Sequence, residues 1–272
     1  MSAVRSIGWK LQREIVLLLA WGPAILLQLA HPLVAQGIAD HSAFRTQRHG
    51  RLRRLYGTID AMLQISFGTE AQARAVIARI NAIHDSVNGH LSGAAGAFPA
   101  GTPYTAHDPA LLAWVHATLL DMNLRVYERY VAPLPLKDKD RYCDEATAIE
   151  VPLGIPVGRL PRGFGELERY MNAMLSSGEI TVTDNARMLA RDVLYPPAPR
   201  VAAPALSLVR LQTIGLLPPG IREGYGLPWS ARRERLLDAS TGLTRAVLGV
   251  MPSIVRHWPA ARRAARRAAR AA

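Results

Sequence analysis

Apolar residues recur every three or four positions along most of this chain, and this helical spacing constrains its fold more than any other feature. No stretch alternates apolar and polar residues over the length of a strand, and no strand pair joined by a hairpin turn is evident. The sequence therefore predicts an all-α fold with a single globular multi-helix domain. Helices are expected over residues 23–37, 51–66, 70–87, 109–130, 137–150, 165–175, 183–194, 203–214 and 230–250.

Two helix starts carry residues that are typical of helix N-termini. Thr69 precedes the acidic first-turn residue Glu70, and Asp108 precedes a first-turn proline, Pro109. Two stretches rich in glycine and proline, 88–105 and 151–165, are expected to stay irregular. Either stretch is suited to border a pocket, although each can also be an ordinary connection.

The N-terminal apolar run, residues 15–30, follows several basic residues and so resembles a secretion signal. Gly22 and Pro23 interrupt the run, and a bilayer span needs about 20 consecutive apolar residues. We therefore interpret Pro23 as the start of a new buried helix, with Trp21 and Gly22 forming the joint.

Positive charge gathers at the C-terminal end of the chain. The formal net charge is +12, and five arginines lie in residues 259–272. On a helix these arginines fall on one side, with alanines around most of the remainder. The pattern predicts a helical domain over residues 1–258 and a basic helical tail over 259–272. Such a tail is suited to contact an anionic membrane, or is simply a solvated segment.

Two further classes of site are disfavoured by the composition. Cys143 is the single cysteine, which excludes an intramolecular disulfide and a site of several thiolates and predicts a reducing, cytoplasmic setting. Nucleic-acid binding is not predicted either, because the chain shows no zinc finger, helix-turn-helix or aromatic recognition strand.

Three of the eight histidines are expected to lie inside the fold. His84 belongs to the apolar stripe of the 70–87 helix, His116 lies four residues from a leucine on either side, and His31 ends an apolar helix. A buried imidazole needs a hydrogen bond or a metal, because an unpaired polar group costs about 1–3 kcal/mol. The three histidines are therefore satisfied core residues, or ligands of a non-haem metal with Glu145, or one of them holds a haem.

Arg54 and Thr58 are four residues apart on the 51–66 helix and so share one face. That face is suited to hold an anionic group such as a haem propionate. A surface arginine beside a threonine that bonds back into its own helix explains the same spacing. Signatures of hydrolases, of phosphate-binding loops and of dinucleotide-binding folds are absent from the sequence.

In order along the chain, many short stretches resemble one family, the helical haem-dependent oxygenases that include the rubber-cleaving latex-clearing proteins and the mpaB-type oxygenases. The stretches occur from about residue 22 to 156. They are Gly22-Pro23, Leu27-Gln28-Leu29-Ala30-His31-Pro32, Asp40-His41-Ser42-Ala43-Phe44, the Arg-Leu-rich start of the 51–66 helix, Phe67-Gly68-Thr69, Ile83-His84-Asp85-Ser86-Val87-Asn88-Gly89, Tyr104 with Asp108-Pro109, Trp114-Val115-His116-Ala117-Thr118-Leu119, Tyr142 with Glu145, and Gly154-Ile155-Pro156.

The resemblance implies one α-helical domain that binds haem b, with His84 as the axial ligand of the iron. Arg54 and Thr58 match the polar pair that the rubber oxygenases place beside the haem. In those enzymes the residue before the threonine is a lysine able to occupy the opposite face of the iron. Here that residue is Gly57, which implies an open or water-filled sixth position.

The leading hypothesis is therefore a haem b-dependent oxygenase that activates dioxygen against a hydrophobic substrate, such as a terpenoid or polyketide alkene. Arg54 would neutralise a propionate, Thr58 would supply a hydroxyl, and His116 or Glu145 would orient water or support the ligand. Two alternatives stay open: a non-haem metal enzyme that uses buried histidines with Glu145, and a non-catalytic helical protein that binds an apolar ligand or a membrane.

Overall fold

The computed structural model describes residues 6–41, 50–196 and 199–270, except for the side chains of residues 50–55. The predicted all-α class is confirmed, with short 3-10 segments and one small hairpin among the helices. The α-helices are α1 (Ile7–Gln12), α2 (Trp21–Leu29), α3 (Pro32–His41), α4 (Gly50–Phe67), α5 (Glu70–His84), α6 (Pro109–Tyr130), α7 (Leu136–Ala146), α8 (Phe164–Ser176), α9 (Asp184–Leu194), α10 (Ala203–Gly215), α11 (Pro219–Gly224), α12 (Ala231–Val250), α13 (Ser253–Arg256) and α14 (Pro259–Arg270). The 3-10 segments are η2 (Ile15–Ala20), η4 (Thr147–Ile149), η5 (Val151–Leu153) and η6 (Arg200–Ala202).

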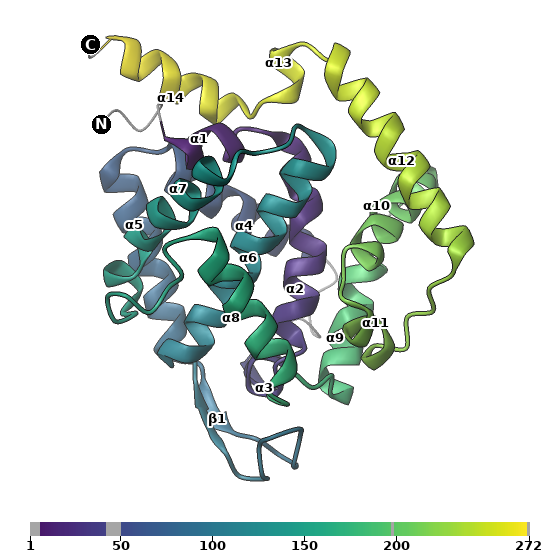
Figure 1. The fold of residues 1–272 in the computed structure, drawn as a ribbon. Helices are drawn as coiled ribbons and strands as arrows, with labels where there is room; N and C mark the ends of the chain where they lie inside the picture. The colour runs from purple at the N-terminus through teal and green to yellow at the C-terminus, as the bar shows by residue number, and fades with distance from the viewer. Residues whose placement is uncertain (1–5, 42–49, 197–198, 271–272) are drawn as a thin grey trace.

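The core forms around α2 and α6, which pack on each other in the middle of the molecule (Figure 1). Both helices are apolar on several sides, and Leu26, Leu27 and Trp114 are fully buried between them and their neighbours. A helix that is apolar around its circumference is stable only when other elements cover it. Helices α3, α8, α9, α10 and α12 supply that cover, since each packs against α2 or α6.

Most helix boundaries agree with the sequence predictions, and the exceptions have local causes. The predicted 23–37 helix is two helices, because Pro32 lacks an amide hydrogen and its ring prevents a helix from continuing through His31. The α-form begins at Trp21, directly after η2, which agrees with the predicted joint. The 70–87 helix ends early, at His84, and the 137–150 helix ends at Ala146 and continues as 3-10 turns.

Local capping explains why the starts of α5 and α6 agree with the sequence predictions. The Thr69 hydroxyl accepts a hydrogen bond from the amide of Gln72, whose side chain binds the Thr69 amide in return. Asp108 accepts a hydrogen bond from the amide of Ala110 at 2.8 Å, ahead of α6. Both residues act as the sequence predicts, because capping depends only on neighbours within one turn.

The 88–105 stretch, expected from the sequence to stay irregular, contains one short strand pair. Within the 88–105 stretch, β1 (Asn88–His90) pairs antiparallel with β2 (Pro103–Thr105), and Gly89 lies opposite Tyr104. Each strand has only three residues, which is too short for an alternating pattern to appear in the sequence. A Cβ atom at Gly89 would lie 2.6 Å from the Tyr104 hydroxyl oxygen, so this pairing requires glycine.

No single helix in the described ranges is long and apolar enough to cross a membrane. Only the two segments Ile15–Leu29 and Pro32–His41, bent by 100° at their junction, meet the length and composition test as a pair. Several of their leucines, including Leu17, Leu26 and Leu27, are buried in the protein core.

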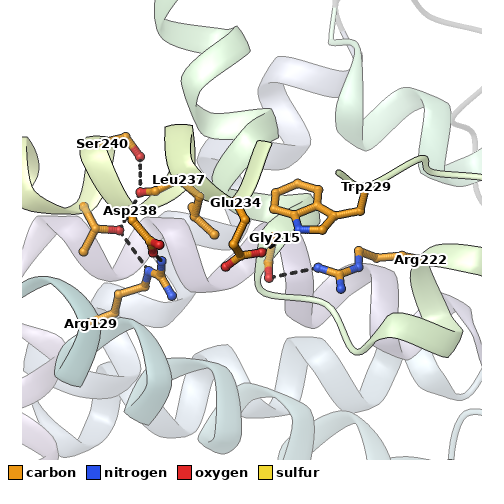
Figure 2. A network of polar contacts seen from close by, with 9 residues as sticks. Arg129, Gly215, Arg222, Trp229, Glu234, Leu237, Asp238 and Ser240 are labelled. Atoms are coloured by element: carbon orange, nitrogen blue, oxygen red, sulfur yellow. Dashed lines mark hydrogen bonds and ion pairs between the residues drawn. The ribbon is translucent and has the colours of Figure 1, made fainter. Parts of the chain in front are cut away.

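Helix α12 docks on the body through a polar network that joins three elements (Figure 2). Arg129 of α6 donates hydrogen bonds to Asp238 and Thr241, each at 2.9 Å. Trp229 donates its indole N–H to Glu234 at 2.6 Å, and the guanidinium of Arg222 lies over the same indole ring. The chain then continues through α13 into α14, so the predicted basic tail is a helix.

Candidate functional site

A cavity of about 780 Å³ lies among α3, α4, α5, α6 and the β2 strand. Its wall is largely apolar, with polar groups at a few positions. The apolar residues are Leu33, Val34, Ile38, Ala61, Ile80, Ile83, Val87, Leu111, Leu112 and Val115. The polar and charged residues are Gln28, His41, Thr58, Asp60, Arg79, His84, Tyr104 and Thr105. A mostly apolar cavity with a few convergent polar groups is typical of a small-molecule or cofactor site.

His84 is the last residue of α5 and lines this cavity. Its Nδ1 atom is buried and has no hydrogen-bond partner in the described part of the chain. Its ring makes an edge contact with the ring of His107, at 5.8 Å between centroids. The prediction placed His84 in a dry interior, whereas the structure places it half-buried on a cavity wall.

The environment of His84 favours the neutral imidazole. Burial lowers the pKa of His84, the nearby His107 lowers it further, and the carboxylate of Asp85 opposes both effects. A neutral imidazole keeps a lone pair available for a metal, whereas a protonated ring does not. The state that the cavity favours is therefore the state a metal ligand requires.

Helix α4 supplies another part of the wall, with Gly57 and Thr58 both lining the cavity. A Cβ atom built at Gly57 would meet no other atom within 4 Å, so this position faces open space. Arg54 lies one helical turn before Thr58 on the same face of α4, and its side chain is outside the described residues. The structure thus brings Thr58 and His84 to one cavity from adjacent helices, α4 and α5.

The structure does not bring the other two predicted site residues to this cavity. Glu145 binds the N-terminal end of α1, where it accepts hydrogen bonds from the amides of Ile7 and Gly8 at 3.2 and 2.9 Å, and it also pairs with Arg141. His116 points elsewhere, toward the backbone of Ala146, and burial lowers its pKa to about 4. Neither His116 nor Glu145 is among the lining residues.

The alternative of a non-haem site built on His31, His84, His116 and Glu145 is contradicted. In the described ranges, no group of three or more His, Cys, Asp or Glu side chains is arranged to hold a metal ion. His31 instead accepts a hydrogen bond on Nδ1 from the amide of Leu33 at 3.3 Å, which is the helix-end role expected beside Pro32.

Two polar pairs beside the cavity escaped prediction as site groups. The Tyr104 hydroxyl donates to Asp40 at 2.6 Å, and burial followed by this hydrogen bond raises the pKa of Tyr104. His107 contacts Asp85 at 2.7 Å next to His84. The β1–β2 register creates the second contact, because pairing Asn88 with Thr105 places the residues before β1 beside those after β2. No local sequence pattern at His107 predicts its contact with Asp85.

Among known proteins, one family matches most of the chain. A family model described as "ER-bound oxygenase mpaB/B'/Rubber oxygenase, catalytic domain" matches residues 9–246. No curated protein and no solved structure shows significant similarity to the chain. The matched range includes α2 to α6 and every residue that lines the cavity. The chain therefore belongs to the mpaB/rubber oxygenase catalytic-domain family, which is a family of oxygenases.

Proposed function

We propose that this oxygenase works with haem b, held by His84, and activates dioxygen against a hydrophobic substrate. The observation that carries the proposal is His84 itself, a neutral-favouring histidine on the wall of an apolar cavity, with a buried ring nitrogen that has no hydrogen-bond partner among the described residues. Other buried side-chain atoms also lack a partner in the described ranges, but of the residues that carry them only His84 lines the cavity, so a ligand for this ring is expected.

The residues present fit a haem. The cavity volume of about 780 Å³ lies within the range of cofactor and small-molecule sites, and a haem needs only one axial histidine rather than a cluster of ligands. When bound, haem supplies the iron chemistry that activates dioxygen. His84 would ligate the iron, and Arg54 would neutralise a propionate from its position one turn before Thr58.

Other side chains of the cavity would act through binding and exclusion of water. Thr58 offers a hydroxyl on the α4 wall, and Gly57 leaves the space beside it open. Leucine, isoleucine and valine side chains from α3, α5 and α6 cover the remaining wall, which suits an apolar substrate such as a terpenoid or polyketide alkene. His116 and Glu145 are assigned no step, because both lie outside the lining.

The test is haem content. Protein expressed with a haem precursor should show a Soret band and about one haem b per chain in a pyridine haemochrome assay. His84→Ala should lose this signal and keep the circular dichroism spectrum of a folded helical protein. His90→Ala is the matched control, because His90 lies exposed on β1 outside the cavity and its loss should leave the haem spectrum intact.

Two results would contradict the proposal. One is a His84→Ala variant that retains the full haem spectrum, which would remove the ligand assignment. The other is folded wild-type protein that stays free of haem when haem is plentiful, which would rule out haem as the cofactor.

A further inference from the structure

The C-terminal segment of residues 231–270, which includes α12, α13 and α14, runs along the outside of the molecule (Figure 1). We call it the C-terminal strap. The family match ends at residue 246, inside α12, so the last part of the strap lies outside the matched range. From residue 239 to the end, the sequence holds seven arginines and no aspartate or glutamate.

Internal contacts fix the strap to the body. Glu14 is only 1% exposed and binds Arg256 at 2.6 Å and His257 at 3.2 Å. The amide of Trp258 donates a hydrogen bond to the carbonyl of Arg13 at 3.0 Å, and Glu14 and His257 form an isolated antiparallel β-bridge beside it. Helix α14 then packs on α4. These contacts define which way α14 faces.

The alanines of α14 face the body and its arginines face outward. Ala261 is buried, whereas Arg263, Arg266 and Arg270 are exposed on the opposite side of the helix. Arg267 is used internally, because it donates to the carbonyl of Phe67 at the end of α4. The three exposed arginines have no carboxylate partner in the described part of the chain.

Exposed aliphatic side chains precede these arginines. Val250, Ile254 and Val255 are 83%, 66% and 57% exposed where α12 meets α13. Leu243 and Val247 are also exposed, and their spacing of four and then three residues to Val250 places all three on one face of α12. An exposed apolar stripe next to unpaired positive charge is the combination that interfacial membrane segments use.

We propose that the C-terminal strap docks on an anionic lipid bilayer, with its apolar stripe entering the headgroup region and the α14 arginines binding lipid phosphates. Charge complementarity selects this partner. A symmetric contact with a second copy would bring two arginine faces together, and nucleic acid is disfavoured because residues 239–270 offer no aromatic side chain except the half-buried Trp258. The proposal does not depend on the haem assignment.

The experiment is co-sedimentation of the full-length protein with vesicles of phosphatidylcholine, with and without phosphatidylglycerol. Binding is expected only to the anionic vesicles and should weaken as salt is added. The triple variant Arg263→Gln/Arg266→Gln/Arg270→Gln should bind about 100-fold more weakly, since each basic residue near such a surface contributes about a fivefold gain. Val250→Ser/Ile254→Ser should also weaken binding to the anionic vesicles, and the size of this loss should not depend on the salt concentration.

Matched variants separate the strap from general effects of charge and polarity. Arg169→Gln/Arg191→Gln/Arg200→Gln removes three exposed arginines from α8, α9 and η6, and Val157→Ser/Val201→Ser removes two equally exposed valines. Both controls should bind like the wild type. Equal binding to neutral vesicles, an equal loss in the controls, no vesicle binding, or binding to duplex DNA in preference to anionic vesicles would each overturn the proposal.

Discussion

At the residue scale, burial determines the charge of histidines far more than neighbouring charges do. His31 is 2% exposed, and burial lowers its pKa to about 4 against a weaker opposing effect of Asp108. Burial has the same effect on His116. The fold therefore keeps both rings neutral down to about pH 4, whereas the unfolded chain binds protons on them near the usual pKa of 6.5.

This linkage predicts acid sensitivity. The pKa of His31 in the folded state lies below its usual value of 6.5, so the unfolded state binds protons more readily in that interval. The stability that His31 contributes is complete above pH 6.5 and falls by about 3 kcal/mol as pH drops toward 4. His31→Gln should flatten this part of the pH dependence in urea unfolding curves, whereas exposed His90→Gln should not. An unchanged slope in His31→Gln would refute the burial argument.

Gly57 offers a second residue-scale prediction, which rests on the proposed haem. A lysine at this position has room to extend, because a Cβ atom there meets nothing within 4 Å. Gly57→Lys should therefore shift the haem absorption spectrum, because the lysine amine would be a new nitrogen ligand for a haem iron held in this cavity. Gly57→Ala gains the same helix propensity, up to about 1 kcal/mol, and should leave the spectrum unchanged. Identical spectra for wild type and Gly57→Lys would show that a side chain at position 57 does not reach the haem iron.

At the element scale, close helix contacts depend on glycines. A Cβ atom at Gly22 of α2 would lie 2.5 Å from the hydroxyl oxygen and 2.8 Å from the methyl carbon of Thr213 in α10. Gly215 plays the same part between α10 and α12, where a Cβ atom would lie 2.5 Å from Leu237 and 2.8 Å from Trp229 (Figure 2). Both glycines leave room for side chains of neighbouring segments to pack against their helices.

Gly22→Ala should accordingly destabilise the protein by about 1–3 kcal/mol, because α2 cannot move away without disturbing the core. Chemical unfolding measures the loss, and adding Thr213→Ala should recover part of it. Gly242→Ala in α12 is the control, since its Cβ atom would meet nothing within 4 Å and the change should be neutral or stabilising. A Gly22→Ala variant as stable as the wild type would contradict the packing account.

At the scale of the whole molecule, one buried carboxylate joins the two ends of the described chain. Glu14 and Arg256 are 242 positions apart, and they meet in an ion pair that also includes His257. Removing the Glu14 carboxylate leaves the Arg256 charge uncompensated, and the cost should stay below the figure of about 3–5 kcal/mol for a fully buried pair because Arg256 is 24% exposed. The loss of local stability should be largest in α13 and α14, which the ion pair holds in place.

Glu14→Gln should therefore accelerate hydrogen exchange in the amides of α13 and α14 more than in α2 or α6. The exposed Glu223→Gln variant on α11 serves as the control and should exchange like the wild type. Uniform acceleration across all helices would mean that Glu14 supports the entire fold rather than the C-terminal strap.

The sequence by itself determined the all-α class, most of the helices and the caps at Thr69 and Asp108, because periodicity and capping depend on residues within one or two turns. Tertiary structure alone decided which side chains meet. The hairpin register brings His107 beside His84, and Glu145 binds α1 rather than the cavity. These contacts join residues distant in the chain, so their cause lies in the packing of whole elements around α2 and α6, which no local pattern encodes.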